Sequence, residues 1–272
     1  MQGGATRGAV EGFGEVGGIR LRYRIEGDGP WLVLIHGVGN RLEAWDGVVA
    51  ALGGRFRTLR WDLRGHGASD KPPGPYALDD FVSDLKGLLD AHGIERCHLA
   101  GFSLGGLVAQ AMALAHPARL DRLVLLSTVA GRSAEERERV AQRLAMVAHG
   151  IPGAHFNNSL ARWFTDEFQR THPEIIAEHA ARNRENDPLA YAAAYCVLAE
   201  SDLADRLHEI KAPTLIATGE NDIGSNPRMA RLMHERIAGS RLVILPRLRH
   251  AILVEAPGTV AGLIEPFLAG SG

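Results

Sequence analysis

A serine between glycines is the first feature of this sequence that could do chemistry. The segment GFSLGG (101–106) has the pattern Gly-x-Ser-x-Gly and joins an apolar run typical of a buried strand (97–102) to a stretch typical of a helix (104–116). On such a strand-to-helix turn the serine has a strained backbone that exposes its hydroxyl, and its small neighbours let the helix pack closely on the strand. This context predicts that Ser103 is a nucleophile.

A serine hydroxyl attacks a carbonyl carbon when an imidazole accepts its proton, and a carboxylate must hold that imidazole in the right tautomer. In chains with this kind of turn, the acid and the histidine follow the serine in that order. Two histidines, His234 and His250, follow the strand predicted at 213–219. His234 has helical spacing to its neighbours, whereas His250 lies in a loop before the last helix, so we predict that His250 is the base.

The predicted acid is Asp222, which follows the strand and turn of PTLIATGEND (213–222). It therefore lies at a carboxyl end of the sheet, as the other two residues do. The sequence Ile-Gly-Ser after it is typical of a turn that could hold a short carboxylate rigidly. The alternative is that Glu220 is the acid and that Asp222 caps the turn.

The negatively charged oxygen of a tetrahedral intermediate needs two backbone N–H donors, and one of them comes from the residue after the nucleophile. That residue is Leu104. The second donor is expected in the loop HGVGN (36–40), where glycines let the backbone approach the substrate, and Val38 is our candidate. His36, and His66 in a second glycine-rich loop, are expected to organise these loops rather than to catalyse.

These residues need a parallel sheet to bring them together. A segment of alternating polarity, GIRLRYRIEGDG (18–29), predicts a half-buried strand after a glycine-rich N-terminal tail. Short apolar runs that end in turn residues predict buried strands, with helix-like stretches between most of them. These strands are expected at 31–36, 56–62, 97–102, 122–128, 213–219 and 241–246.

Between residues 131 and 203 the strand pattern is missing, and the composition becomes helical and charged. A crossover between two strands needs one helix, so several helices here predict a separate helical cap over the carboxyl ends of the strands. We therefore divide the chain into a core domain, formed by residues 1–130 and 204–272, and an inserted cap, formed by residues 131–203.

The chain has 272 residues, of which 46% are hydrophobic, and a formal net charge of −2. This composition is typical of a globular protein, and the near-neutral charge argues against a nucleic-acid partner. The sequence shows no apolar segment long enough to span a membrane and no recognisable signal peptide, so we expect a cytoplasmic protein without a membrane partner. The oligomeric state stays open.

One segment, GFGEVG (12–17), matches the dinucleotide-binding pattern Gly-x-Gly-x-x-Gly. It neither follows a predicted strand nor opens a predicted helix, so it lacks the context that gives the pattern its meaning. The sequence contains no phosphate-binding loop of the P-loop type and no spacing of histidine, cysteine and carboxylate residues that is typical of zinc. We therefore expect no cofactor and no metal.

Several segments together resemble the α/β-hydrolase superfamily over nearly the whole chain. They are HGVGN (36–40), DLRGHGASDKP (62–72), GFSLGG (101–106), GENDIGS (219–225) and the pair RH (249–250). The resemblance implies an α/β-hydrolase fold: a mostly parallel eight-stranded sheet with helices on both faces and a helical cap inserted after the sixth strand. It also implies that Ser103, Asp222 and His250 form the triad of a serine hydrolase, which cleaves its substrate through an acyl-enzyme.

Within this superfamily, the predicted cap is similar to that of 3-oxoadipate enol-lactonases and related carboxylesterases. The similarity implies a small ester or lactone substrate, such as an enol-lactone of aromatic catabolism. Candidate substrate contacts are an arginine that could pair with a carboxylate and four aromatic residues that could line the pocket, namely Arg162, Trp163, Phe164, Tyr191 and Tyr195. The aromatic residues could instead form the core of the cap.

Other activities on the same scaffold stay open. Epoxide hydrolases and haloalkane dehalogenases carry an aspartate where this chain has Ser103. Hydrolases of carbon–carbon bonds typically have an asparagine before the serine and a tryptophan after the histidine, whereas this chain has Phe102 and Ala251. The alternatives to an esterase or lactonase are a carbon–carbon bond hydrolase, a cofactor-free haloperoxidase and a ligand receptor with slow turnover.

Overall fold

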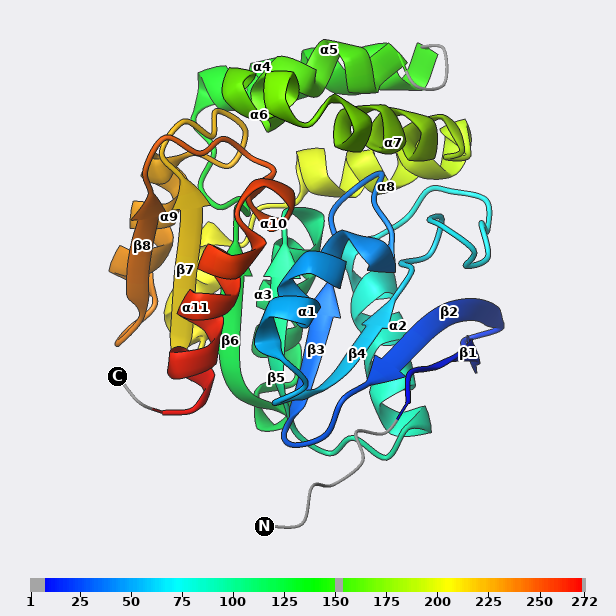
Figure 1. Cartoon of the computed structure of the whole chain (residues 1–272), viewed down its shortest axis with the longest axis vertical. Coiled ribbons are helices and arrows are strands. Elements are labelled where there is room, and N and C mark those ends of the chain that lie inside the picture. Colours follow the sequence, from blue (N-terminus) through cyan, green and yellow to red (C-terminus); the bar gives the residue numbers. More distant parts are fainter. Residues whose placement is uncertain (1–7, 150–153, 271–272) are drawn as a thin grey trace.

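The computed structural model describes residues 8–149 and 154–270. These residues form one eight-stranded sheet with the strand order β1-β2-β4-β3-β5-β6-β7-β8 (Figure 1). The two pairs that involve β2 are antiparallel, and the other neighbouring strands are parallel. The strands are β1 (Val10–Val16), β2 (Ile19–Glu26), β3 (Trp31–Ile35), β4 (Arg57–Trp61), β5 (Cys97–Phe102), β6 (Leu120–Leu126), β7 (Thr214–Gly219) and β8 (Arg241–Leu245). The predicted fold class is confirmed.

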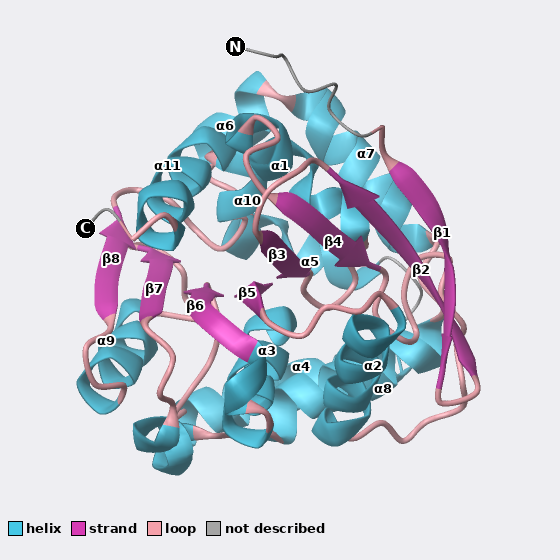
Figure 2. Cartoon of the chain, turned by 90° about the horizontal axis from the view of Figure 1, so that it is seen from below, coloured by secondary structure: helices cyan, strands magenta, loops and turns pink. Residues whose placement is uncertain are grey.

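Helices cover both faces of this sheet, as the view from below shows (Figure 2). One face carries α1 (Asp46–Leu52), α10 (Ile252–Glu255) and α11 (Pro257–Leu268), and the other carries α2 (Leu78–Ala91), α3 (Leu104–Ala115) and α9 (Pro227–Arg236). Three short 3₁₀ helices connect these elements, namely η1 (Leu42–Trp45), η2 (Pro117–Arg119) and η3 (Ala204–Glu209).

The central strands are mostly apolar because both of their faces are covered, and β3 is apolar at every position. In β3, Leu32 and Leu34 pack in the cluster under α1 and α11, whereas Val33 and Ile35 pack in the cluster under α2 and α3. Successive side chains of a strand point to opposite faces, so a strand between two helical layers becomes a continuous apolar run. This is why these strands could be predicted within one or two residues.

The expectation of a glycine-rich N-terminal tail is wrong for residues 10–16, which form the edge strand β1. Its glycines hid the strand pattern, because glycine is depleted in strands. They are needed here for close packing: a Cβ atom at Gly12 would lie 3.0 Å from the Tyr23 hydroxyl, and one at Gly14 would lie 3.1 Å from Leu88 Cδ2. The dinucleotide-like pattern at 12–17 therefore lies on a strand and the turn after it, and it opens no helix.

Between β6 and β7, the chain forms a group of helices that lie above the carboxyl ends of the strands (Figure 1). They are α4 (Ala134–His149), α5 (Ala154–Trp163), α6 (Asp166–Thr171), α7 (Pro173–Arg184) and α8 (Pro188–Glu200). Side chains that accept hydrogen bonds from backbone N–H groups cap three of them, Ser133 at α4, Thr165 at α6 and Asp187 at α8. Over the described part of the chain, no helix combines the length and apolar character needed to cross a membrane.

Candidate active site

Ser103 lies in the turn between β5 and α3 in a backbone conformation that few residues adopt. Its φ is 55° and its ψ is −117°, which is a strained region for a residue with a side chain. The turn is held from several sides: Ser103 N donates to Leu126 O at 3.0 Å, and the Thr128 hydroxyl donates to Ser103 O at 2.7 Å. The surrounding structure therefore fixes the strained serine in place.

The glycines of the GFSLGG segment make this turn possible. A Cβ atom at Gly101 would collide with the carbonyl oxygen of Gly105, and one at Gly105 would collide with that of Ile35. At Gly106 the obstacle is the Thr128 side chain. These contacts let α3 begin directly against the sheet, which leaves Ser103 at the top of β5 and only 7% exposed.

Asp222 and His250 form a hydrogen-bonded pair above the neighbouring strands. Asp222 follows β7 and His250 follows β8, and their Oδ2 and Nδ1 atoms lie 2.6 Å apart. The Asp222 side chain is fully buried, and its other oxygen accepts hydrogen bonds from the backbone N–H groups of Gly224 and Ser225, both at 2.9 Å. The carboxylate therefore holds the imidazole by one oxygen and is itself held by the other.

Burial disfavours the charge of Asp222 and by itself would raise its pKa. The facing His250 imidazole and the amides of Ser225 and Gly224 outweigh that effect, so the pKa of this carboxyl group is lowered. An ionised Asp222 keeps the proton of His250 on Nδ1 and leaves Nε2 as the proton acceptor.

The loops after β7 and β8 are tied to each other, which fixes the position of this pair. Asn221 N donates to Leu248 O at 2.9 Å, and Asn221 Nδ2 donates to Arg247 O at 3.1 Å. The cap also contacts the second loop, because Ala251 N donates to Trp163 O at 2.9 Å. His250 therefore lies between two hydrogen-bonded anchors.

The alternative acid, Glu220, and the histidine not chosen as the base, His234, each have another hydrogen-bond partner. Glu220 accepts a hydrogen bond from the backbone N–H of Arg247 at 2.8 Å, in an exposed turn. His234 is an exposed residue of α9, and its Nδ1 lies 2.9 Å from the Ser240 hydroxyl. Neither side chain lines the cavity that contains Ser103, Asp222 and His250.

The two residues predicted to donate to the oxyanion belong to segments that adjoin Ser103. Leu104 is the first residue of α3, and the first N–H groups of a helix have no acceptor within it. Val38 belongs to a turn in which Asn40 N donates to Gly37 O at 3.2 Å and Gly39 has a φ of 73°. A Cβ atom at Gly37 would lie 2.9 Å from Ser103 Cβ, so this turn packs directly against the serine.

His36 supports the same turn, as expected. Leu63 N donates to His36 Nε2 at 3.0 Å, so Nδ1 carries the proton and donates to Gly37 O at 2.8 Å. The His66 ring lies edge-on to it with a centroid distance of 5.2 Å. Burial lowers the pKa of His36 to about 4 and that of His66 to about 3. Both histidines are therefore neutral parts of the scaffold.

All five predicted substrate contacts line the same cavity, which lies between the sheet and the cap. They are Arg162, Trp163, Phe164, Tyr191 and Tyr195. The rings of Tyr191 and Tyr195 stack with a centroid distance of 6.3 Å, and both also pack with Val140 in an apolar cluster of the cap. The two tyrosines therefore line the cavity and also form part of the core of the cap.

Several polar residues of the cavity wall are not among the contacts predicted from the sequence. They are Asn40, Arg41, Arg132, Arg143, His179, Arg182 and Asn183. Arg143 of α4 is the most informative, because its Nε donates to the Tyr195 hydroxyl at 3.2 Å, beside Arg162. One signal could have found it: Arg143 follows Val140 by three residues, so both lie on the helix face that packs against α8.

Arg143 and Arg162 bring two positive charges to the cap side of the cavity. Arg162 donates to the Ser159 hydroxyl, and burial, followed by the nearby charge of Arg143, lowers the pKa of its guanidinium group. No carboxylate of the described residues lies within 4.0 Å of either guanidinium group. The described residues also contain no cluster of histidine, cysteine and carboxylate side chains that could hold a metal ion.

A family model for the α/β-hydrolase fold matches residues 30–257. The chain belongs to this family and is a hydrolase, which confirms the resemblance found in the sequence. Its relatives include 3-oxoadipate enol-lactonase 2 of Acinetobacter baylyi, which is 29% identical over 91% of this chain and 92% of its own.

Two solved structures are similar to the whole chain. The enol-lactonase from Burkholderia xenovorans has a TM-score of 0.90 and 32% identity, over 95% of this chain and 100% of its own. A thermophilic esterase from Thermogutta terrifontis, solved with malate bound, has a TM-score of 0.86 and 29% identity, over 97% of this chain and 99% of its own.

Proposed function

We propose that this hydrolase cleaves a carboxylic ester or lactone through an acyl-enzyme formed on Ser103. The observation that carries the proposal is the 2.6 Å hydrogen bond between His250 and Asp222 in the cavity that also contains a strained, glycine-flanked serine. His250 Nε2 takes the proton of Ser103 as its oxygen attacks the carbonyl carbon, and the same proton then goes to the leaving alcohol. The N–H groups of Val38 and Leu104 stabilise the oxyanion.

A water molecule, deprotonated by His250, then attacks the acyl-enzyme and releases the acid. In this proposal the residues 1–130 and 204–272 form the catalytic core, and residues 131–203 form the cap. The carboxylate of Asp202 supports this boundary, because it accepts hydrogen bonds from Gly131 N at 2.9 Å and from Arg132 N at 3.2 Å. The two ends of the insertion therefore meet at one side chain.

We further propose that the substrate carries a carboxylate besides the bond to be cleaved, as an enol-lactone acid does. Arg143 and Arg162 support this, since two adjacent guanidinium groups in a partly buried cavity favour an anionic ligand. Two similar proteins agree with a carboxylate-bearing substrate. One is named for 3-oxoadipate and the other was solved with malate bound, and both compounds are dicarboxylates. Trp163, Phe164 and the stacked tyrosines would enclose the apolar part of the substrate.

The test of the reaction is labelling with a fluorophosphonate, which reacts with activated serines. We expect the wild-type protein to be labelled at Ser103 and to hydrolyse p-nitrophenyl acetate, and we expect Ser103→Ala to lose the label and at least about 10⁴-fold in turnover with an unchanged melting temperature. Undiminished turnover by Ser103→Ala would contradict the proposal.

The test of the substrate class compares pairs of esters that differ in one charge. Monomethyl succinate and methyl butanoate have similar length, so a higher kcat/KM for the charged ester would support the carboxylate site. An enol-lactone acid and a 1,3-diketone acid complete the panel. Preferred cleavage of the diketone would place the protein among the carbon–carbon bond hydrolases instead.

A further inference from the structure

The connection between α7 and α8 in the cap contacts the turn after β3. Asn186 lies in this connection, next to Asp187, which caps the first turn of α8. The Asn186 side chain donates from Nδ2 to the carbonyl oxygen of Gly39 at 3.1 Å. A residue of the cap therefore binds the backbone of the turn that packs against Ser103.

The packing around Gly39 makes this contact specific. A Cβ atom there would lie 2.6 Å from Tyr191 Cε2, 3.3 Å from Asn183 Nδ2 and 3.4 Å from Asn186 Nδ2. The internal hydrogen bond of the turn joins Asn40 N to Gly37 O and does not use the Gly39 carbonyl. The peptide unit between Gly39 and Asn40 is therefore held at both ends, by the turn at its N–H and by the Asn186 amide of the cap at its carbonyl oxygen.

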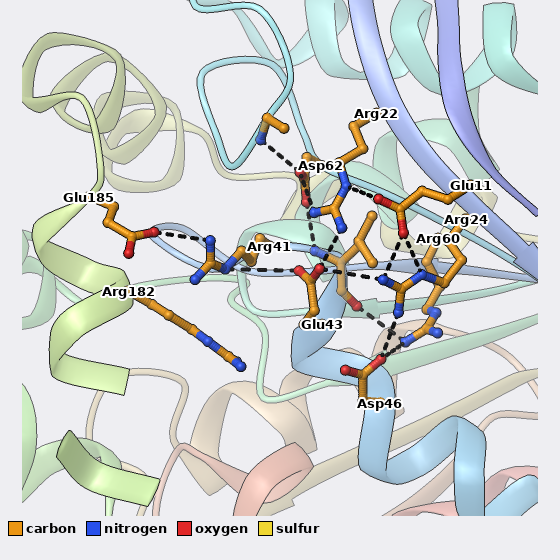
Figure 3. Close-up of polar contacts among 12 residues, drawn as sticks. Glu11, Arg22, Arg24, Arg41, Glu43, Asp46, Arg60, Asp62, Arg182 and Glu185 are labelled. Atoms are coloured by element: carbon orange, nitrogen blue, oxygen red, sulfur yellow. Dashed lines mark hydrogen bonds and ion pairs between the residues drawn. The ribbon is translucent and has the colours of Figure 1, made fainter. Parts of the chain in front are cut away.

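A chain of ion pairs joins the same turn to the sheet and to the cap (Figure 3). Arg41 Nη1 donates to Glu185 Oε2 at 3.1 Å, and Arg41 Nε lies 3.9 Å from Glu43, which accepts a hydrogen bond from Arg22 Nη2 at 2.6 Å. The Glu185 side chain is 64% exposed, so its ion pair contributes little to stability in water. The hydrogen bond from the Asn186 amide, in contrast, is partly buried.

We propose that Asn186 is a positioning residue for the oxyanion site. By holding the Gly39 carbonyl, it fixes the turn that presents the Val38 N–H beside Ser103. The inference rests on the proposed function, because it takes Val38 as the second oxyanion donor. Oxyanion donors act through preorganisation, and a small displacement of such a donor lowers the reaction rate more than it lowers the affinity for the ground state.

The test uses an alkyl trifluoromethyl ketone, which mimics the tetrahedral intermediate. The Ser103 oxygen adds to its carbonyl carbon, the Ser103 proton goes to His250, and the ketone oxygen becomes an oxyanion. In Asn186→Ala we expect kcat/KM for p-nitrophenyl acetate to fall about 10-fold and the inhibition constant of the ketone to rise by the same factor. Asn186→Asp keeps the size of the side chain but removes the donor, and it should lower kcat/KM at least as much.

The matched control is Gln169→Ala. Gln169 is also a cap residue whose amide donates to a backbone carbonyl, that of Phe164 at 3.0 Å, but it does not touch the turn. It should leave both quantities within about 2-fold. The inference is wrong if kcat/KM of the Asn186 variants falls without a matching loss of ketone affinity, or if neither changes. A wild-type protein that the ketone does not inhibit would contradict the serine mechanism itself.

Discussion

The sheet side and the cap side of the cavity differ in how their polar groups are bound. On the sheet side, Asp222 is fully buried, with hydrogen bonds to His250 and to two backbone amides, and Ser103 is fixed by hydrogen bonds on both sides. On the cap side, the hydrogen bonds of Arg143 and Arg162 to described residues go to hydroxyl groups. The sheet side is therefore held by buried hydrogen bonds, whereas the two guanidinium groups of the cap side are bound to neutral groups and keep their positive charge.

The largest effect should come from breaking the hydrogen bonds of the sheet side. We expect Asp222→Asn to lower kcat by about 10⁴-fold, because an amide favours the wrong tautomer of His250 and no longer stabilises the imidazolium ion. Steady-state kinetics with p-nitrophenyl acetate measure this. Glu220→Gln is the control, since Glu220 binds only the backbone of an exposed turn, and it should keep kcat within about 2-fold. A larger loss in Glu220→Gln than in Asp222→Asn would reverse the assignment of the acid.

Acid should loosen the same side through its buried histidines. Burial lowers the pKa of His36 from the ordinary value of 6.5 to about 4 in the folded protein, so below pH 6.5 the unfolded chain binds a proton that the native protein does not. Stability is therefore lost as the pH falls, by at most about 1.4 kcal/mol per pH unit, or about 2 kcal/mol between pH 6.5 and pH 4.5.

Urea unfolding at several pH values measures this linkage. In His36→Asn, the slope of the unfolding free energy against pH should decrease by about one proton over this range, whatever the stability of the variant at pH 7. An equal slope in both proteins would show that His36 is protonated in the native state. His36 would then not be a neutral part of the scaffold on the sheet side.

The cap side should respond in specificity rather than in chemistry. We expect Arg143→Met and Arg162→Met each to lower kcat/KM for monomethyl succinate by about 10- to 30-fold and to leave that for methyl butanoate within about 2-fold, because a charge-assisted hydrogen bond is lost. Arg139→Met is the control on the same helix, since Arg139 is exposed and pairs with Glu135. An equal loss of kcat/KM for both esters would mean that the arginines stabilise the cap and do not bind the carboxylate of the substrate.

Much of the fold could be predicted because its signals are local. A strand covered on both faces is mostly apolar, so WLVLI and CHLAGF are recognisable without knowing their neighbours. β1 was missed because its glycines serve a distant partner: they make room for the ring of Tyr23 and the side chain of Leu88. Space requirements of this kind leave no periodic pattern in the sequence.

The candidate site also contains residues with local sequence signals and residues that depend on contacts between distant segments. Ser103, Asp222 and His250 could be predicted because each follows a strand end, and parallel strands bring their carboxyl ends to one edge of the sheet. The residue type alone does not predict Arg143, because α4 contains several arginines. Its spacing of three residues from Val140 becomes informative only once α4 is known to pack on α8 with that face.

The sequence by itself therefore determined the class of fold, the order of the strands along the chain and the residues suited to acyl transfer. Only the tertiary structure decided that Asp222 and not Glu220 faces His250, that Arg143 lines the same cavity as Ser103, and that Asn186 binds the turn around Gly39. The physical reason is the range of the interactions: strand patterns and strained turns are local, whereas these contacts join residues that are far apart in the chain and meet only when the cap packs on the sheet.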